Sequence, residues 1–471
     1  MNCDFLKPAA EAVRKAGGRL LLVGGRVRDH FLKPRGAETA GVRERLNPPP
    51  DDGPDFDLTL LGLDFAEALP ILSAFGQARL IGRRTTRKAE KEDSLIHLRL
   101  TEGLLEISRA RRFTGEGLEY SAEAGLADDA QCRDFTINAL YHDPLSLALE
   151  DPLGGLDDIR SRRLRLCHPE SLIRDPLRML RAFGQIARFG LTADPEVLVS
   201  CAANRDLLHE VPEDRFWPEW RKWALSPQPH LGLEFLADGG LLEFWPPLAA
   251  LPGTPQNPRF HPEGNAWRHT VLVVKAMADL DLPPQADRLA LVLAALLHDI
   301  GKPLVTEMVD GVWLSRGHAQ AGLTLAGEFL ESIKAPTRLA KPVAKLVERH
   351  MDLAFQAITP KALKKLARRL APECNLAEYW AMVTADWNGR GPTLEPFPLT
   401  LEEFLEPLGG LATPPEPLLM GRDILENFDF QPGPGLGRLL KLIEDAADDG
   451  RLHNRDEALA YAAKLIRGGL N

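Results

Sequence analysis

The pattern of apolar and polar positions divides the chain into a short mixed part and a long helical part. Near the N-terminus, short apolar or alternating runs predict strands over residues 19–23, 55–61 and 95–100, with helix-like segments at 9–16 and 65–75. From about residue 171 onward, apolar residues recur at helical spacing almost throughout. Helices are predicted at 176–189, 195–208, 269–280, 286–298, 319–333 and 339–351. The pattern therefore predicts an α+β chain, with a small mixed α/β head followed by helical domains.

Clusters of proline and glycine predict where these parts join. Residues 33–54 are rich in turn formers and poor in apolar residues, which predicts a long loop or insertion within the head. Residues 246–264 hold six prolines and predict a domain boundary, and 411–417 predict a second linker. A chain of 471 residues is long enough for two to four domains. We expect a head (1–145), a helical neck (146–250), a third domain (260–390) and a helical tail (391–471).

The composition is that of an ordinary globular protein. Hydrophobic residues make up 44% and charged residues 26% of the chain, which argues against wholesale disorder and fibrous classes. The longest apolar run, at 289–297, is too short to cross a membrane, and the N-terminal residues show no apolar core of a secretory signal. Five scattered cysteines without a CxxC spacing exclude a disulfide scaffold and a cysteine-based zinc site. We therefore expect a cytoplasmic protein without a membrane partner.

The net charge of −10 excludes a wholly basic nucleic-acid coat but leaves room for local basic faces. Two basic runs stand out. The first contains Arg160, Arg162, Arg163 and Arg165, and the second contains Lys361, Lys364, Lys365, Arg368 and Arg369. For the second run, a solvated helix face is the favoured interpretation.

Two carboxylates on one predicted strand indicate a metal site. Asp55 and Asp57 are two residues apart, so on a strand both side chains project from the same face. Carboxylates held this close favour a hard cation such as Mg²⁺, which can bridge phosphates. Taken alone, the Asp-x-Asp pattern more often marks a turn or a helix cap.

A second motif indicates phosphate binding. The apolar run 19–23 leads into Gly24 and Gly25, and a helix carrying Arg28 follows at once. Glycines let backbone N–H groups approach a phosphate, and an arginine can donate two hydrogen bonds to its oxygens. A lone glycine pair would be a plain turn, but this order together with a downstream Asp-x-Asp strand favours a functional turn.

Three further motifs follow in order: RDFTINAL from Arg133, DPLGG from residue 151, and RDPLRMLRA from residue 174. In the last motif, Pro176 suits the first position of a helix and Asp175 its N-cap. Arg178 and Arg181 then follow at intervals of about one helical turn. Capping by Asp175 and a salt-bridged surface for the arginines are the plain alternatives to a binding role.

These five motifs, over residues 19–245, resemble the nucleotidyltransferases that include tRNA CCA-adding enzymes and bacterial poly(A) polymerases. The resemblance implies template-independent transfer of a nucleoside monophosphate to an RNA 3′ end. It implies that Gly24, Gly25 and Arg28 hold the triphosphate, that Asp55 and Asp57 are catalytic and hold Mg²⁺, that Arg133 and Asp134 contact the nucleotide, and that Asp175, Arg178 and Arg181 select the base. An aspartate and an arginine fixed in one plane can supply the acceptor and donors that such selection needs.

The helical part contains a second set of candidate metal ligands: His269, His298, Asp299, His318, His350 and Asp386. A lone histidine is more often a buried core residue, but six residues of suitable type in this order favour a metal site. The set resembles the HD phosphohydrolase domain over residues 261–390, which implies one or two divalent metals and phosphoester hydrolysis. The mixture of imidazole and carboxylate ligands favours Mn, Ni, Co or Zn.

We therefore expect an enzyme that adds or repairs the CCA end of tRNA with CTP, ATP and Mg²⁺, fused to an HD domain. Close alternatives are a poly(A) polymerase and an enzyme that adds only CC or only A. A different class of alternative is an HD phosphohydrolase or RNA-binding module with an inactive head, against which the intact Asp55 and Asp57 argue. The residues do not give the terminal nucleotide, the substrate of the HD domain or the oligomeric state.

Overall fold

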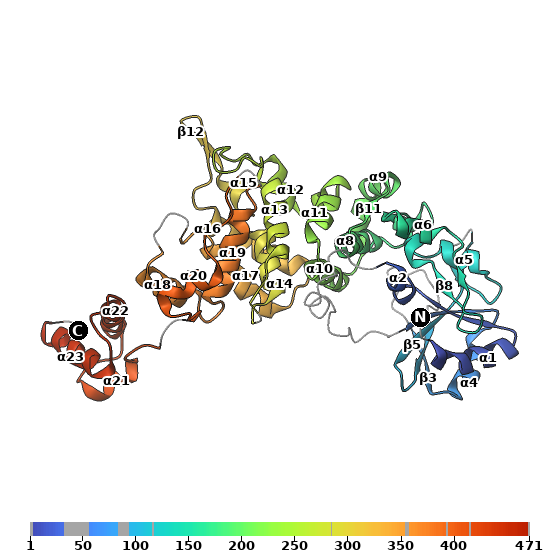
Figure 1. Cartoon of the computed structure of the whole chain (residues 1–471), viewed down its shortest axis with the longest axis horizontal. Helices are drawn as coiled ribbons and strands as arrows, with labels where there is room; N and C mark the ends of the chain where they lie inside the picture. The colour runs from blue at the N-terminus through green and yellow to red at the C-terminus, as the bar shows by residue number, and fades with distance from the viewer. Residues whose placement is uncertain are drawn as a thin grey trace.

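The computed structural model of the chain describes residues 3–32, 56–82, 94–114, 117–283, 285–353, 358–391, 394–413 and 416–469. The predicted insertion at 33–54 and Asp55 lie outside these ranges. The molecule is elongated, with the mixed head at one end and the last helices at the other (Figure 1). No helix in the described ranges is both long and apolar enough to cross a membrane.

The head is built on a seven-stranded sheet of order β3-β4-β5-β2-β1-β8-β9. Its strands are β1 (Arg19–Val23), β2 (Phe56–Leu61), β3 (Gln77–Gly82), β4 (Ser94–Arg99), β5 (Leu104–Arg109), β8 (Tyr141–His142) and β9 (Leu149–Glu150). β1 runs antiparallel to β2, whereas β2 runs parallel to β5. All three predicted strands are therefore confirmed, and the chain has the predicted α+β class.

Both faces of this sheet are covered. Alternate side chains of β1 point to opposite faces, so that Leu20 and Leu22 join the main core while Leu21 and Val23 join a smaller one. The two predicted helical segments are confirmed as α1 (Lys7–Lys15) and α4 (Phe65–Ser73), and both pack on the sheet. α5 (Leu126–Gln131), the 3₁₀ turn η2 (Thr136–Asn138), α6 (Gly155–Arg160) and the hairpin β6 (Arg111–Thr114) and β7 (Gly117–Tyr120) complete this region.

A bundle of helices follows the head. It contains α7 (Ser171–Arg174), α8 (Arg178–Phe189), α9 (Pro195–Asn204), α10 (Phe216–Ala224) and α11 (Pro229–Asp238), with β10 (Arg163–Leu164) pairing β11 (Thr192–Ala193). Its core is aromatic: the ring of Phe183 stacks on Trp223 at 5.3 Å and meets the edge of Trp220 at 4.9 Å. The predicted helix 195–208 is wrong at its end, because the chain tightens into a 3₁₀ turn from Arg205.

The predicted start of the helix at Pro176 is also wrong. α8 begins at Arg178, and Asp175 has extended backbone angles (φ −137°, ψ 92°) as the residue that ends α7. No side chain caps the N-terminus of α8. The aspartate is therefore held in a break between two helices, where its carboxylate is available for other contacts.

The third domain surrounds one fully buried helix. α14 (Arg288–Leu297) is buried at every position after Arg288, and it is packed by α13 (Ala266–Asp279), α17 (Thr337–Arg349), α19 (Leu376–Asn388) and α10. α12 (Pro246–Ala249), α15 (Lys302–Val305), the hairpin β12 (Glu307–Val309) and β13 (Val312–Leu314), α16 (His318–Ser332) and α18 (Pro360–Leu370) complete it. The apolar run 289–297 is thus the central helix of a core, and the predicted helices of this part are confirmed.

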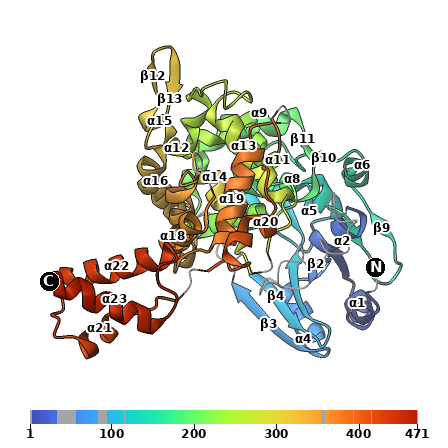
Figure 2. The same ribbon diagram turned by 60° about the vertical axis from the view of Figure 1, so that its left-hand side comes forward.

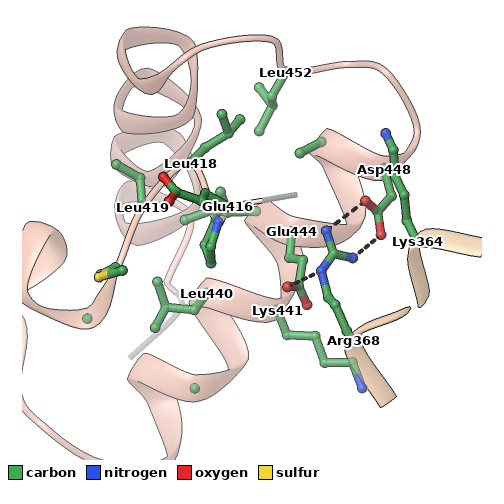
Figure 3. Close-up of a pocket in the computed structure, with 16 residues that line it drawn as sticks. Lys364, Arg368, Glu416, Leu418, Leu419, Leu440, Lys441, Glu444, Asp448 and Leu452 are labelled. Carbon is green, nitrogen blue, oxygen red and sulfur yellow. Dashed lines mark hydrogen bonds and ion pairs between the residues drawn. The ribbon is translucent and has the colours of Figure 1, made fainter. Parts of the chain in front are cut away.

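The tail is helical, as expected: α20 (Leu401–Leu405), α21 (Gly421–Asn427), α22 (Pro434–Asp448) and α23 (Arg455–Arg467). The last three form a bundle with a core of its own (Figure 2). This bundle, residues 416–469, meets the third domain where α22 packs on α18, and the two helices line an open pocket of about 690 Å³ (Figure 3). The exact limits of the four domains stay predictions.

The interface between α18 and α22 corrects the interpretation of the second basic run. Arg368 donates to both carboxylate oxygens of Asp448, and its Nε lies 2.6 Å from Glu444 Oε1 (Figure 3). Lys361 donates to Asp449 at 2.5 Å. Arg368 and Lys361 therefore hold the tail bundle against α18, and the predicted solvated face is wrong for this side of the helix. Lys365 and Arg369 of the same run are exposed, and Arg369 pairs with Asp352, so on their side the prediction is confirmed.

The first basic run is likewise paired within the protein. Arg160 donates to Asp157 at 2.7 Å, Arg165 contacts Asp158 at 2.9 Å, and Arg163 pairs with Asp194. These arginines tie α6 and the strands β10 and β11 to their surroundings.

Candidate active sites in the head and the helical body

The glycine turn and the strand carboxylate lie side by side in the head. Val23 and Asp57 are register partners of β1 and β2, so Gly24, the next residue, begins its turn beside Asp57. Gly24 has a φ of 77°, and a Cβ at this position would lie 3.2 Å from Asp57 Oδ2. Any other residue would be strained and would crowd the carboxylate. α2 (Gly25–Phe31) starts at this turn. The backbone of Gly24 and the carboxylate of Asp57 thus lie in one small site. Asp55 precedes Asp57 by two residues and lies outside the described ranges.

A third acidic residue lies next to this pair. Glu106 on β5 is the register partner of Asp57 across the parallel β2–β5 pairing, so both side chains project from the same face. His97 Nε2 lies 3.8 Å from Glu106 Oε2 on the far side. Sequence reasoning missed Glu106 because its partner lies almost fifty residues away, and only the strand order brings them together.

Arg28 joins the glycine turn to the neck. Its side chain is 8% exposed, its Nε donates to Asp29 at 2.7 Å, and its Nη1 donates to Asn138 Oδ1 at 2.8 Å. Its guanidinium also lies over the ring of Phe189, 4.5 Å from the centroid, at the end of α8. Arg28 is therefore fixed between α2, η2 and α8. Its predicted contact with a triphosphate stays a prediction.

Arg133 lies in a buried network around Asp129, which is fully buried. Its Nη2 donates to Asp129 at 3.0 Å and to Thr59 at 2.7 Å, and its Nε donates to the hydroxyl of Tyr141 at 2.9 Å. Burial alone would lower the pKa of Arg133, but the negative charge of Asp129 outweighs this effect, so the pKa of Arg133 is raised. Arg133 therefore supports the sheet face behind the site, and its predicted contact with the nucleotide remains untested.

Asp134 and the neck arginines form a chain of charges across the junction of head and neck. Arg181 Nη1 lies 3.5 Å from Asp134 Oδ2, and its Nη2 lies 4.0 Å from Asp175 Oδ2. Asn138 donates to Asp134 Oδ1 at 2.9 Å. Burial would raise the pKa of Asp134, but the charges of Arg181 and Arg178 outweigh it and lower the pKa. Asp134 is thus held ionised at the junction.

Asp175 and Arg178 form a pair with unused hydrogen-bonding capacity. Arg178 Nη1 donates to the Arg133 carbonyl at 3.0 Å and to Ser171 Oγ at 2.6 Å, and its Nη2 donates to the Cys132 carbonyl at 2.9 Å. Its Nε lies 3.7 Å from Asp175 Oδ2. Among the described residues, neither Arg178 Nε nor Asp175 Oδ1 finds a hydrogen-bond partner, although both atoms are buried. The backbone of the head therefore fixes the guanidinium of Arg178. One acceptor, Asp175 Oδ1, and one donor, Arg178 Nε, are left without a hydrogen-bond partner within the described residues.

In the helical body, the structure brings all six predicted metal ligands together. His269 comes from α13, His298 and Asp299 from the end of α14, His318 from the start of α16, His350 from the end of α17, and Asp386 from α19. His269 Nε2 lies 3.0 Å from Asp386 Oδ1, His318 Nε2 lies 3.2 Å from Asp299 Oδ1, and His318 and His350 face each other through Nε2 atoms 3.1 Å apart. Five of the six are at least nine-tenths buried, and Asp386 is partly exposed.

Three of these histidines are oriented in the same way. His298, His318 and His350 each place Nδ1 2.8–2.9 Å from the backbone carbonyl three residues earlier. Donation from Nδ1 leaves Nε2 as the lone-pair nitrogen that faces the cluster.

The cluster fits a divalent cation. Burial, together with the charges of His298 and His318, lowers the pKa of His350 to about 3, so His350 is neutral. His298 Nε2 is buried and has no hydrogen-bond partner within the described ranges. Imidazole nitrogens and carboxylate oxygens that converge in this way are a donor set that suits a first-row metal.

Four residues around this cluster were missed. Lys302 Nζ lies 2.6 Å from Asp299 Oδ2 and donates to Gln256 Oε1 at 2.5 Å. Glu263 Oε1 lies 2.7 Å from His269 Nδ1 and 2.9 Å from His261 Nδ1. Gln256, His261 and Glu263 all come from the proline-rich stretch 246–264, which was expected to be only a boundary. The sequence HDIGKP around Lys302 was the available signal; the proline-rich stretch gave none because it has no periodicity.

Comparison with known protein families agrees with this division of the chain. Residues 20–165 match the "Poly A polymerase head domain", and residues 266–380 match the "HD domain". Residues 190–251 match the "Probable RNA and SrmB- binding site of polymerase A". Enzymes of the nucleotidyltransferase and HD families use divalent metals.

Several curated relatives are similar over most of the chain. The CC-adding tRNA nucleotidyltransferase of Thermus thermophilus is 33% identical over 74% of this chain and 79% of its own length. The multifunctional CCA protein of Methylococcus capsulatus is 32% identical over 72% and 80%. The multifunctional CCA protein of Halorhodospira halophila is 36% identical over 54% of this chain, and the match spans 61% of that relative's length.

Solved structures share the fold. The Bacillus stearothermophilus CCA-adding enzyme in complex with CTP superposes with a TM-score of 0.60 at 19% identity, over 99% of both chains. The Thermotoga maritima CCA-adding enzyme complexed with tRNA gives 0.58 at 17% identity, over 99% of this chain and 95% of that one. By this similarity the chain belongs to the family of tRNA nucleotidyltransferases and poly(A) polymerases, and it carries an HD domain.

Proposed function

We propose that this protein adds or repairs the CCA 3′ end of tRNA, using CTP and ATP and releasing pyrophosphate. One observation carries the proposal: the Gly24 turn lies directly against the Asp57 carboxylate, so that a phosphate held by backbone amides would lie beside an acidic metal ligand. The names of the relatives, CC-adding and multifunctional CCA proteins, support the choice of tRNA as the acceptor.

In this proposal the head residues position the reacting groups. Backbone N–H groups of Gly24 and Gly25 and the guanidinium of Arg28 bind the triphosphate, while Asp57, Asp55 and the neighbouring Glu106 hold Mg²⁺. Bound Mg²⁺ supplies activation of the tRNA 3′-hydroxyl and neutralises the phosphate charge. The remaining barrier is lowered by holding the hydroxyl and the α-phosphate in line.

Base selection falls to the pair at the junction of head and neck. Asp175 Oδ1 offers an acceptor and Arg178 Nε a donor, both unsatisfied within the described chain. A base whose edge complements them would satisfy both atoms, whereas a mismatched base would leave them unpaired. Asp134 and Arg181 hold Asp175 in place, and Arg133 with Asp134 would approach the ribose.

The test is extension of tRNA transcripts that lack CCA, lack CA or lack only the terminal A, with each nucleotide offered singly and together. Restoration of all three ends by CTP and ATP supports the proposal. Growth by a long A tract would show a poly(A) polymerase, and arrest after CC or acceptance only of the A-lacking transcript would show a restricted enzyme. No extension of any transcript would overturn the assignment of the head.

We also propose that the HD domain hydrolyses phosphoesters with one or two bound transition metals among Mn, Ni, Co and Zn. The supporting observation is the convergence of the six histidine and aspartate side chains in two adjoining groups of three, of which all but Asp386 are buried. Elemental analysis of purified protein and hydrolysis of a chromogenic phosphomonoester or a cyclic nucleotide test it. Protein that carries no transition metal, and that hydrolyses neither substrate when these metals are added, would contradict it.

A further inference from the structure

We infer that Glu263 is a positioning residue of the HD metal site, which fixes His269 and strengthens it as a metal ligand. The inference rests on the proposed metal site but concerns a residue outside the six ligands. Glu263 Oε1 lies 2.7 Å from Nδ1 of His269, whose Nε2 faces Asp386 at 3.0 Å. The carboxylate therefore lies on the side of the imidazole that points away from the metal cluster.

Glu263 is placed as a second layer behind the ligand. Its side chain is 2% exposed and that of His269 is 1% exposed, so water does not compete for their contact. His261 donates from Nδ1 to the same Oε1 at 2.9 Å. A single buried carboxylate oxygen thus lies within reach of two imidazole nitrogens. It lies at ion-pair distance from His269 Nδ1, which has no aligned hydrogen bond among the described residues, and its negative charge favours the form of His269 that carries its proton on Nδ1 and presents a lone pair on Nε2.

His269 differs from the other three candidate ligand histidines in the group that its Nδ1 contacts. His298, His318 and His350 contact neutral backbone carbonyls through Nδ1. His269 alone among these four contacts a charged carboxylate at this position. A carboxylate behind an imidazole increases the electron density on the metal-binding nitrogen, and losing such a partner typically weakens metal binding about 10–100-fold.

The loop that carries Glu263 is held without it. Gln256 donates to the Gly264 carbonyl at 3.3 Å, and Asn265 caps α13 by accepting from the Arg268 amide at 2.8 Å. Asn265 also donates to the Pro252 carbonyl at 2.9 Å. Removing the charge of Glu263 should therefore leave the loop in place, and its effect should appear in metal binding and not in the fold.

The experiment measures Co²⁺ binding to the full chain after chelator treatment and dialysis, by visible absorption and by competition with a chromophoric chelator. We expect Glu263→Gln to weaken Co²⁺ binding about 10–100-fold and to alter the ligand-field spectrum, because Gln keeps the size and removes the charge. Glu307→Gln, the same change on the exposed β12–β13 hairpin, should bind as wild type does. In a His269→Ala background, Glu263→Gln should cause no further loss.

Equal Co²⁺ affinity and spectrum for Glu263→Gln and wild type would overturn the inference while leaving the metal site intact. Wild-type protein that takes up no Co²⁺ would instead overturn the proposed site itself. Thermal unfolding of the metal-free proteins checks the fold. Should Glu263→Gln unfold early, Glu263→Asp decides: affinity above that of Glu263→Ala supports the role of the charge, and affinity equal to it rejects that role.

Discussion

The two candidate sites are built in opposite ways. The head site lies on the central strands of a sheet, where a glycine turn after β1 meets carboxylates of β2 and β5, and Asp57 itself is exposed. The HD site lies at the end of the most buried helix of the chain, and its ligands come from helices α13 to α19. In the proposed function a bound nucleotide completes the first site, whereas side chains of the protein alone form the second. The head should therefore bind metal weakly without substrate, whereas the HD site should retain its metal through purification.

The largest effect is expected at the head. Asp57→Ala should reduce tRNA extension about 10³-fold or more, because a lost metal ligand removes several kcal/mol of transition-state stabilisation. The transition-metal content should stay at the wild-type level because the HD site is separate. Single-turnover extension of tRNA and elemental analysis of the same sample measure both. Extension at near the wild-type rate would remove Asp57 from the active site.

The complementary change is His298→Ala combined with Asp299→Ala. Bound transition metal and phosphoester hydrolysis should both be lost, while tRNA extension in Mg²⁺ should stay within about twofold, since interfaces between domains of one chain are usually modest in size. Metal content, hydrolysis and extension are measured on one preparation. A folded double variant that no longer extends tRNA would show that the head site and the HD site are coupled and not independent.

Removal of metal should separate the sites by stability. A ligand at about 100 times its Kd stabilises the folded state by about 2.7 kcal/mol, so chelation should lower the thermal midpoint of the wild-type protein and Co²⁺ should restore it. The double variant at His298 and Asp299 should show neither change. Calorimetry with and without chelator gives the comparison. An identical response in both proteins would place the stabilising metal elsewhere.

The smallest effect is expected in nucleotide choice. Asp175→Ala should reduce the preference for CTP and ATP over UTP and GTP more than it slows transfer, by about 1–3 kcal/mol for a lost bidentate contact. Relative kcat/KM for the four nucleotides measures it. A uniform fall in rate with selectivity intact would assign Asp175 a structural role at the junction of α7 and α8 instead.

What the sequence predicted well was local. The strand that ends at the glycine turn is carried by residues close in sequence. The clustering of the six candidate metal-binding residues in the helical body followed from a recognisable series of residue types, and their role as ligands stays a prediction. What it missed was contact between distant segments. Glu106 meets Asp57 through strand order, Glu263 reaches His269 from a proline-rich stretch without periodicity, and Arg368 meets Asp448 from another helix. The capping role given to Asp175 was wrong because tertiary contacts, not local propensity, shape the chain there.

The position of α8 has a consequence for the proposed selection of the nucleotide. Its first residue, Arg178, is bound to carbonyls of the head, and near its last turn Arg188 donates to Asp29 at 2.9 Å while Phe189 lies under Arg28. The helix is about 18 Å long and is fastened to the head at both ends. A shift of the glycine turn would therefore also move the residues proposed to select the base. In the proposed function, phosphate binding and base choice would then be coupled through α8, and the fidelity of nucleotide addition would depend on the rigidity of this one helix.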